Sequence, residues 1–487
     1  MKSIRCAGRG LTRRILATGM CCCVILAACG SGVAPPASSS PASVSASRAS
    51  ASASVTGSAA PFGASKPAGS SPTAAAAGET TASATGGPIK IGLLAPLTGP
   101  VADAAKENID GFNLYLESIG NTVAGRKIEV IPADDQFKAD VGLTKAKELV
   151  ESQKVHLLAG IFATPVCYAV ATYVQQAKLP LVVTGQCGAQ TMMTDPKFAS
   201  SYLVRFTQNA TVVTGPPADW AYKQGYRKAM LMLSDFGGGL ETADGFASMF
   251  VKRGGSIVQE QYPAQGSTDF GPFLAKLNKD ADFAYVFLPG VDGLRFMDQI
   301  RNYADISKLP IIDAYAAMTD GSNLDALKDK AVGIIQEGLY TSAADTPENQ
   351  AFVKAWQAKY PGRYVSSSVA QGYAGAQIIA AALNKVNGKV EQTQDFLNAL
   401  YATNVNTAKG PIKLDANHDV VESVYIDRVV KQGDRFGQQL LATYKDVSRS
   451  WERTPQEMEN FPLGKLKGQW VGMTKEKLES LSAPAKR

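Results

Sequence analysis

The sequence predicts an α/β protein with two similar lobes, each built on a parallel sheet. Short apolar runs alternate with segments whose apolar residues recur every three or four positions, and turns containing glycine or proline join them. This alternation is typical of βαβ units. It starts at Pro88 and begins again after Arg205. Because a body that reaches to about Trp470 is too long for one hydrophobic core, we expect the two halves to fold as separate lobes.

The elements of the first half follow one another at regular spacing. Apolar runs predict strands at residues 89–95, 127–131, 155–160 and 179–184. Helical spacing of apolar residues predicts one helix that carries Ile109, Phe112, Leu116 and Ile119, and two more over residues 139–152 and 166–178.

The second half repeats this order. Its expected strands lie at residues 228–233, 256–258, 283–288 and 310–313, and its expected helices lie at residues 241–253, 270–277 and 292–303. Ligands of open α/β sheets bind beyond the carboxyl ends of the strands. The candidate ligand-binding loops are therefore residues 97–105, 161–165, 184–190, 235–239, 289–292 and 313–318.

The first 28 residues predict an export signal. Five basic residues precede an apolar run over residues 15–28, which ends in Leu26-Ala27-Ala28 followed by Cys29. This arrangement resembles a bacterial lipoprotein signal, and the resemblance implies that Cys29 is lipidated. The alternative is a transmembrane helix, but the run of about 14 residues is shorter than the roughly 20 that a bilayer needs. We therefore expect a lipid anchor on the extracytoplasmic face of the cell membrane.

Composition separates a tether from the folded body. Residues 29–87 comprise the cysteine and a segment of Ala, Ser, Pro, Gly and Thr, which buries too little apolar surface to fold and predicts a disordered tether. Five of the six net positive charges lie in the signal, so the rest of the chain is nearly neutral. A nearly neutral body argues against nucleic acid as a partner.

Only two of the seven cysteines, Cys167 and Cys187, lie in the folded body. A single pair in an exported protein favours a disulfide, since the compartment is oxidising and no other pairing competes. The alternative is two buried free thiols.

The sequence lacks the residue sets of common enzymes. Its two histidines, His156 and His418, have no suitably spaced partners for a zinc site or a Ser-His-Asp triad. No P-loop or Gly-x-Gly-x-x-Gly motif is present, and Gly237-Gly238-Gly239 is interpreted as a tight strand–helix turn. We therefore expect no catalysis, no metal and no cofactor.

Three segments carry a family resemblance. They are Pro96-Leu97-Thr98-Gly99-Pro100, residues 120–160 (GNTVAGRKIEVIPADDQFKADVGLTKAKELVESQKVHLLAG) and residues 352–383 (FVKAWQAKYPGRYVSSSVAQGYAGAQIIAAAL). Together they resemble type I periplasmic-binding proteins of the leucine/isoleucine/valine-binding family. The resemblance runs from about residue 89 to residue 427 and implies a monomer whose two lobes close on a small solute and present it to an ABC permease. The alternative is a sensor of the same fold that signals to a membrane kinase.

The resemblance also implies a domain layout. Lobe 1 would comprise residues 88–207 and 338–408, and lobe 2 would comprise residues 209–337 and 409–487 with the C-terminal tail. Three crossings between the lobes would fall near Thr207, Gly338 and Gly410, where a few loop residues absorb the closure.

The family's ligand contacts are carried over to matching positions. The expected ligand-binding residues are Phe162, Ala163, Thr164, Thr184, Gln186, Gly188, Phe236 and Tyr315. A wall tyrosine of the family aligns with Ala104. For the aromatic residues, ordinary packing inside a lobe is the alternative, and for Thr164 it is a helix N-cap.

Two departures from the family bear on the ligand. Gly188 stands where the family has a threonine, and Tyr315 stands where it has the acid that pairs with an α-ammonium group. A buried ammonium without a carboxylate partner is costly. We therefore expect an aromatic or small organic acid or an amide rather than an amino acid. If the alignment is shifted by two residues, Asp313 or Asp292 would supply the missing charge.

Overall fold

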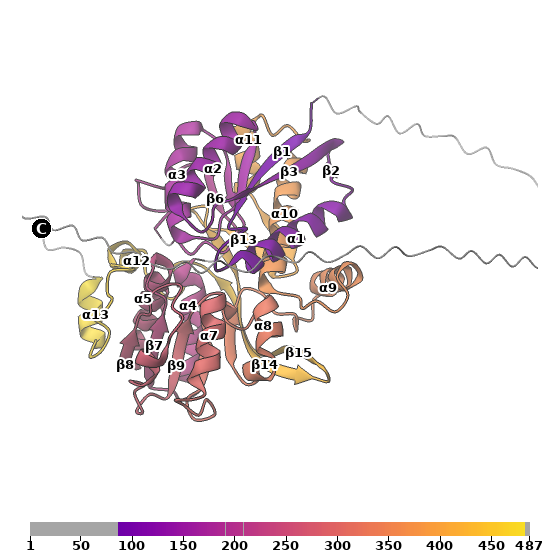
Figure 1. Ribbon diagram of the computed structural model, residues 1–487. Coiled ribbons are helices and arrows are strands. Elements are labelled where there is room, and N and C mark those ends of the chain that lie inside the picture. Colours follow the sequence, from indigo (N-terminus) through magenta and orange to yellow (C-terminus); the bar gives the residue numbers. More distant parts are fainter. Residues whose placement is uncertain (1–85, 190, 208, 483–487) are drawn as a thin grey trace, which may run out of the picture. The chain divides into compact units, whose positions relative to one another are not determined.

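The computed structural model describes residues 86–189, 191–207 and 209–482 and shows two α/β lobes (Figure 1). The predicted signal peptide, Cys29 and all but the end of the predicted tether lie outside these residues. Within them, no helix is both long enough and apolar enough to cross a membrane.

The first lobe is built on a six-stranded sheet. In spatial order its strands are β2 (Thr122–Val123), β3 (Arg126–Asp134), β1 (Ile89–Ala95), β4 (Leu157–Gly160), β5 (Leu181–Val183) and β6 (Leu203–Arg205). All neighbours are parallel except β2, which pairs antiparallel with β3. The carboxyl ends of β1, β4 and β5 therefore lie along one edge of this sheet.

The second sheet contains nine strands. Eight follow one path, in the order β12 (Asn404–Thr407), β13 (Gly410–Leu414), β14 (Val420–Gln432), β11 (Ile335–Gly338), β10 (Ile311–Asp313), β9 (Phe283–Phe287), β7 (Lys228–Leu233) and β8 (Ser256–Gln261). The ninth, β15 (Arg435–Val447), forms an antiparallel hairpin with β14. Strands β7 to β11 are parallel, so the ends of β7, β9 and β10 also share one edge.

Helices cover both faces of each sheet. The first lobe contains α1 (Ala102–Ser118), α2 (Ala139–Lys147) with its π-helical end (Glu148–Ser152), α3 (Thr164–Ala177), α9 (Pro347–Lys359), α10 (Ser367–Lys385) and α11 (Thr393–Tyr401). The second lobe contains α4 (Ala210–Lys223), α5 (Gly237–Lys252), α6 (Gly271–Leu274), α7 (Val291–Ile300), α8 (Gly321–Leu327), α12 (Pro455–Asn460), α13 (Lys475–Leu481) and two 3-10 turns at Ala314–Ala316 and Lys328–Ala331.

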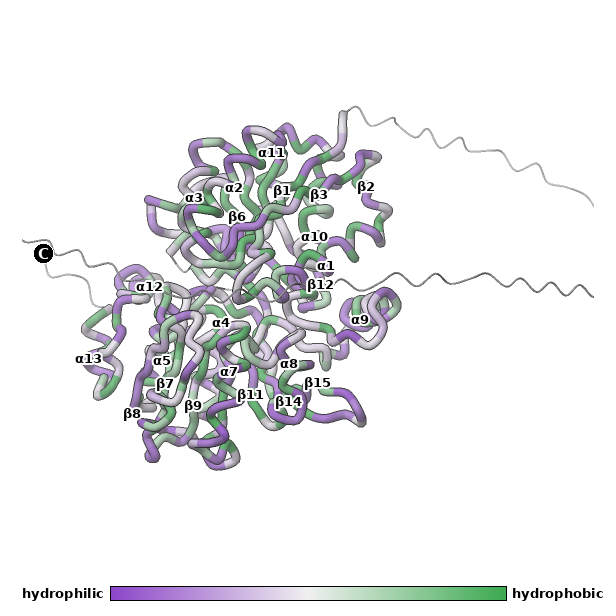
Figure 2. Tube along the Cα trace, viewed as in Figure 1, coloured by the Kyte–Doolittle hydropathy of each residue, from purple (hydrophilic) through white to green (hydrophobic). Residues whose placement is uncertain are grey.

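Alternating side chains of the central strands pack into two different hydrophobic cores in each lobe. In β1, Ile91 and Leu93 pack with α1, α10 and α11, whereas Leu94 packs with α2 and α3. In β7, Leu231 packs with α4 and α5, whereas Met230 packs with α7 and α8. Figure 2 shows the hydrophobic strands inside each lobe and the hydrophilic tip of the β14–β15 hairpin. Burial on both faces explains why these strands are continuous apolar runs.

Three chain segments join the lobes, and they meet in one small apolar cluster. Val212 follows the first crossing, Leu339 lies in the second and Val424 lies in the third. The third crossing lies inside β14, because Val420 packs in the core of the first lobe and Ile426 packs in that of the second. This differs from the predicted crossing near Gly410, since Ile412, beyond that point, still packs in the first lobe.

Tertiary packing also forms elements that the sequence pattern did not indicate. Helix α4 contains Pro216 and Pro217, which interrupt helical hydrogen bonding. Its start is capped by Asn209, whose side chain accepts from two backbone N–H groups. The C-terminal tail adds Trp470 to the core of the second lobe, and its indole donates to Asp244. Burial thus stabilises these segments, although their sequences lack the local patterns that predict structure.

Candidate functional site

A cavity of about 340 Å³ lies between the two lobes. The loops that follow β1, β4 and β5 line it from the first lobe, and those that follow β7, β9 and β10 line it from the second. Each of the six candidate loops contributes at least one lining residue. Its volume lies in the range of small-molecule sites.

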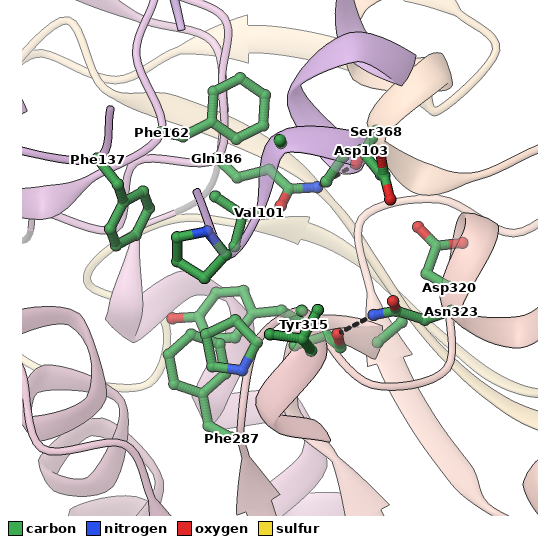
Figure 3. A pocket seen from close by; sticks show the side chains of 18 of the residues that line it. Val101, Asp103, Phe137, Phe162, Gln186, Phe287, Tyr315, Asp320, Asn323 and Ser368 are labelled. Carbon is green, nitrogen blue, oxygen red and sulfur yellow. Dashed lines mark hydrogen bonds between the residues drawn. The ribbon is translucent and has the colours of Figure 1, made fainter. Parts of the chain in front are cut away.

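Aromatic rings form much of the wall. Phe137 and Phe162 come from the first lobe, and Phe287 and Tyr315 come from the second (Figure 3). Phe236 of the second lobe also lines the cavity. Neighbouring rings touch in series: the ring centroids of Phe137 and Phe236 are 6.2 Å apart, and those of Phe287 and Tyr315 are 5.0 Å apart. Aromatic faces of this kind stack well on a flat apolar ligand.

One part of the wall gathers neutral hydrogen-bond donors, and we call it the donor end. It consists of Thr164, Gly188 and Gly238. Thr164 is the first residue of α3, and Gly238 is the second residue of α5, in the opposite lobe. A Cβ atom added to Gly238 would lie only 3.2 Å from Thr164 Oγ1, and one added to Gly188 would lie 3.8 Å from it. The two helices therefore begin at the same place.

The donor end has the chemistry of an anion site. The residues that precede the two helices, Ala163 and Phe236, provide no side-chain cap. Free N–H groups and positive dipole ends thus face the cavity from both lobes. The Thr164 hydroxyl makes no hydrogen bond with another described residue. Within the described chain no lysine or arginine lines the cavity, so an anion would be held by neutral donors.

A disulfide joins the two first-lobe loops of the donor end. Cys167 lies in the first turn of α3, three residues after Thr164, and Cys187 directly precedes Gly188. The two Cα atoms are 6.7 Å apart. The bond therefore fixes the start of α3 relative to the loop after β5.

A second part of the wall holds two acids, one buried and one partly buried, and we call it the carboxyl end. It consists of Glu107 on α1 and Asp320 just before α8. Asp320 Oδ2 accepts a hydrogen bond from the Ser367 N–H at 2.7 Å, and Glu107 Oε1 accepts one from the Ser322 N–H at 3.2 Å. Each bond crosses from one lobe to the other.

Burial perturbs both acids. It raises the pKa of Glu107 above its ordinary value, although the Ser366 hydroxyl donates to Glu107 Oε2 at 2.6 Å. Burial, followed by the negative charge of Glu107, raises the pKa of Asp320 well above its ordinary value. Contact between the lobes therefore makes the ionised form of each acid costly unless a further hydrogen-bond donor reaches it.

Further contacts hold the lobes together around the cavity. Gly290, after β9, lies against the Pro100 carbonyl oxygen, which a Cβ atom would approach to 2.0 Å. The Tyr168 hydroxyl of α3 donates to Glu241 of α5 at 3.0 Å. The cavity is therefore enclosed by both lobes.

The structure places six of the eight expected binding residues in the cavity wall. Ala163 and Thr184 are described residues outside the lining. Ala163 is the N-cap position of α3. Thr184 is buried and has structural partners: its hydroxyl accepts from the Gly160 N–H at 3.1 Å, and its carbonyl accepts from Asn108.

The alternative charges considered for lobe 2 also lie outside the lining. Asp313 is buried and accepts hydrogen bonds from Met318 and Thr319, and Asp292 accepts from the Gly266 N–H and pairs with Arg295. Both acids thus hold loops of the second lobe.

Several lining residues were not predicted from the sequence. They include Phe137, Gly238, Phe287, Asp320, Asn323 and Ser368. Gly238 could have been found, because a glycine run directly after a buried strand is a signal for a helix that starts at a ligand. Asp320 and Ser368 gave no such signal, since only folding brings α8 and α10 to the cavity.

We also searched for groups of side chains that could bind a metal ion. In the described residues no group of three or more His, Cys, Asp or Glu side chains is placed to hold a metal ion. Two lobes that enclose one cavity at the carboxyl ends of their strands define the class of solute-binding proteins.

Comparisons with known proteins give the family. A family model described as "Periplasmic binding protein" matches residues 88–434, so the chain belongs to that family. "Leu/Ile/Val-binding protein homolog 6" of Brucella melitensis is 28% identical over 355 residues, which cover 71% of this chain and 88% of that protein. The predicted family and fold class are therefore confirmed.

Two solved structures extend the likeness. An ABC transporter substrate-binding protein from Sphaerobacter thermophilus is 32% identical, with a TM-score of 0.70, over 74% of this chain and 99% of that one. A solute-binding protein of an ABC transporter from Rhodopseudomonas palustris BisB5, solved with 3,4-dihydroxybenzoic acid, is 31% identical, with a TM-score of 0.68, over 74% of this chain and 98% of that one. The chain is a substrate-binding protein of the ABC transporter type.

Proposed function

We propose that this protein captures a small aromatic carboxylate in the cavity between its lobes and delivers it to an ABC importer. The observation that carries the proposal is the combination of aromatic walls with a donor end that lacks a basic side chain. A carboxylate there would accept hydrogen bonds from Thr164 and from the N–H groups of two helix starts. Its ring would lie among Phe162, Phe236 and Tyr315.

The same arrangement disfavours α-amino acids. An α-amino acid carries its ammonium group on the carbon next to the carboxylate, so both charges would reach the donor end together. Of the lining carboxylates Asp103, Glu107 and Asp320, the last two form the carboxyl end, and Figure 3 shows Asp103 on the side of the site that Asp320 faces. The ammonium group would therefore be buried without a partner. The Rhodopseudomonas palustris relative, solved with an aromatic acid, supports the same ligand class.

Calorimetry on the mature protein tests the ligand class. We expect benzoate-type acids to bind and leucine, isoleucine and valine to bind weakly or not at all. Thr164→Ala should weaken aromatic-acid binding by about 1–3 kcal/mol, because a buried carboxylate oxygen loses its donor. Thr164→Ser keeps the hydroxyl and is the matched control. Leucine binding that is tighter than that of every aromatic acid would overturn the proposal.

Delivery and anchoring need cellular tests. Deletion of the gene should abolish uptake of labelled aromatic acid, whereas a sensor would change a transcriptional response and leave basal uptake intact. Cys29→Ser should release the protein from the membrane or leave an uncleaved precursor. A processed, membrane-bound Cys29→Ser protein would exclude the lipid anchor.

A further inference from the structure

One carboxylate oxygen in the cavity wall lacks a partner. Asp320 lines the cavity at its carboxyl end, and its Oδ2 atom accepts the Ser367 N–H at 2.7 Å. Its Oδ1 atom is buried and has no hydrogen-bond partner among the described residues. Figure 3 shows the Asp320 carboxylate at the side of the site, turned from the second lobe toward Ser368 and Asp103 of the first.

Three protein donors near the carboxyl end already have acceptors. The Asn323 amide donates to the Ala317 carbonyl at 3.1 Å, and the Gln186 amide donates to the Ser368 hydroxyl at 2.8 Å. The Ser366 hydroxyl donates to Glu107 at 2.6 Å. Because buried polar atoms in native structures are paired, an oxygen left over in a ligand-binding wall indicates a donor on the ligand.

The two polar ends of the cavity are separate. Thr164, Gly188 and Gly238 approach one another at the donor end. The carboxyl end is built from other elements, since Glu107 lies on α1, Asp320 precedes α8 and its partner Ser367 begins α10. A ligand whose carboxylate occupies the donor end therefore presents the far side of its ring to Asp320.

We propose that Asp320 accepts a hydrogen bond from a ring hydroxyl of the ligand and so selects hydroxylated benzoates over benzoate. This inference rests on the proposed function, since it assumes an aromatic carboxylate held at the donor end. A site built to pair with a substrate hydroxyl rejects the analogue that lacks it, because the buried oxygen of the protein then stays unpaired.

Ligand analogues test the inference in the wild-type protein. Calorimetry should show 4-hydroxybenzoate or 3-hydroxybenzoate binding about 10- to 100-fold more tightly than benzoate. The fluorobenzoate with the same substitution pattern has similar size but no donor, and it should bind like benzoate. A fluorobenzoate that binds like the hydroxybenzoate would show that size decides, and it would overturn the inference.

Substitutions test the residue. In Asp320→Asn the amide oxygen can keep the Ser367 N–H, which turns the NH2 group rather than an acceptor toward the ligand. We expect the preference for hydroxybenzoate to fall to a few-fold while benzoate affinity changes little. Asp320→Ala should show the same loss of preference, even if weaker lobe contact lowers the affinity for both ligands.

A matched control uses a second acid of the same wall. Asp103 also lines the cavity, but 74% of its side chain is exposed. Asp103→Asn should leave the ratio of hydroxybenzoate to benzoate affinity unchanged. A ratio that survives both Asp320 substitutions would refute the role of Asp320 and leave the proposed function standing. Failure of every aromatic acid to bind would instead refute the proposed function.

Discussion

The donor end and the carboxyl end of the cavity deal with negative charge in opposite ways. At the donor end, Thr164 and Gly238 bring two helix starts together, and no side chain there is charged. At the carboxyl end, the buried Glu107 and the partly buried Asp320 accept hydrogen bonds from N–H groups of the opposite lobe. The donor end thus favours the binding of an anion, and the carboxyl end disfavours it. This difference would fix the orientation of a bound carboxylate ligand in the cavity.

The two ends also use the lobes differently. Backbone N–H groups hold an anion without the desolvation cost of a buried lysine or arginine. Both ends join residues of both lobes, so each is complete only when the lobes meet. The anion site and the desolvation of the two acids therefore both depend on contact between the lobes.

The largest expected effect comes from placing a negative charge at the donor end. Thr164→Asp places a carboxylate at the first position of α3, where the ligand carboxylate would lie. Like charges at this distance should weaken aromatic-acid binding by about 3 kcal/mol or more, a loss of over about 100-fold. The unliganded protein should unfold at the same or a higher denaturant concentration, because an acid suits a helix start.

Calorimetry and urea titration of the Thr164→Asp protein check the two expectations. Thr164→Asn, which has nearly the same size and no charge, is the control. Retention of wild-type affinity in Thr164→Asp would place the ligand carboxylate elsewhere.

Loss of the disulfide tests whether the donor end depends on the covalent link between its two first-lobe loops. Cys167 and Cys187 close a loop of 20 residues, so reduction should lower the free energy of unfolding by about 3 kcal/mol. We also expect weaker aromatic-acid binding, because Thr164 and Gly188 lose their fixed relation. Thiol titration of the denatured, non-reduced protein should find neither cysteine free. Two free thiols in that protein would contradict the bond.

A smaller effect is expected from an aromatic ring of the cavity wall. Tyr315 lines the cavity, and its hydroxyl lies 3.2 Å from Thr242 Oγ1. Tyr315→Ala should weaken aromatic-acid binding by about 1–2 kcal/mol through loss of ring contact. Tyr315→Phe keeps the ring and should bind nearly as well as the wild type. Equal calorimetric affinities for the Ala and Phe variants would show that the ring does not touch the ligand.

The smallest expected effect is a pH dependence confined to the carboxyl end. Contact between the lobes raises the pKa values of Glu107 and Asp320, so the closed protein binds more protons than an open one. Falling pH should therefore favour contact between the lobes and increase the affinity for benzoate, which has no hydroxyl to donate to Asp320. The charges that face Glu107 are Arg363, Asp103 and Asp320, and they are included in these directions.

Titration calorimetry at several pH values measures this slope. The double variant Glu107→Gln with Asp320→Asn should flatten it, whereas Thr164→Ala should keep it. An affinity that rises with pH would reverse the assigned direction.

Much of the fold could be predicted because it depends on local patterns. The apolar runs predicted β1 at Ile89–Ala95 and β7 at Lys228–Leu233 with their observed bounds. Strands buried on both faces leave this signal in the sequence. Helix α4 left none, because Pro216 and Pro217 mask a segment that packing and the Asn209 cap hold in helical form.

The site was predictable only to the level of its loops. The rule that ligands lie beyond the ends of parallel strands selected six loops, and each of them lines the cavity. It also selected Thr184, whose side chain instead bonds to the Gly160 N–H inside the first lobe. The direction of a side chain within a loop depends on neighbours that are distant in the chain.

The sequence by itself determined the alternation of strands and helices, the division into two lobes, and Thr164 and Gly188 as residues of the cavity wall. The alternation follows from short-range periodicity, the division into lobes from the length of the body, and the two residues from the family resemblance. Only the tertiary structure decided that Gly238 meets Thr164 and that Asp320 meets Ser367, a contact across 47 residues of chain and two lobes. The physical reason is that both meetings depend on how the lobes pack, and packing between lobes leaves no period in the sequence.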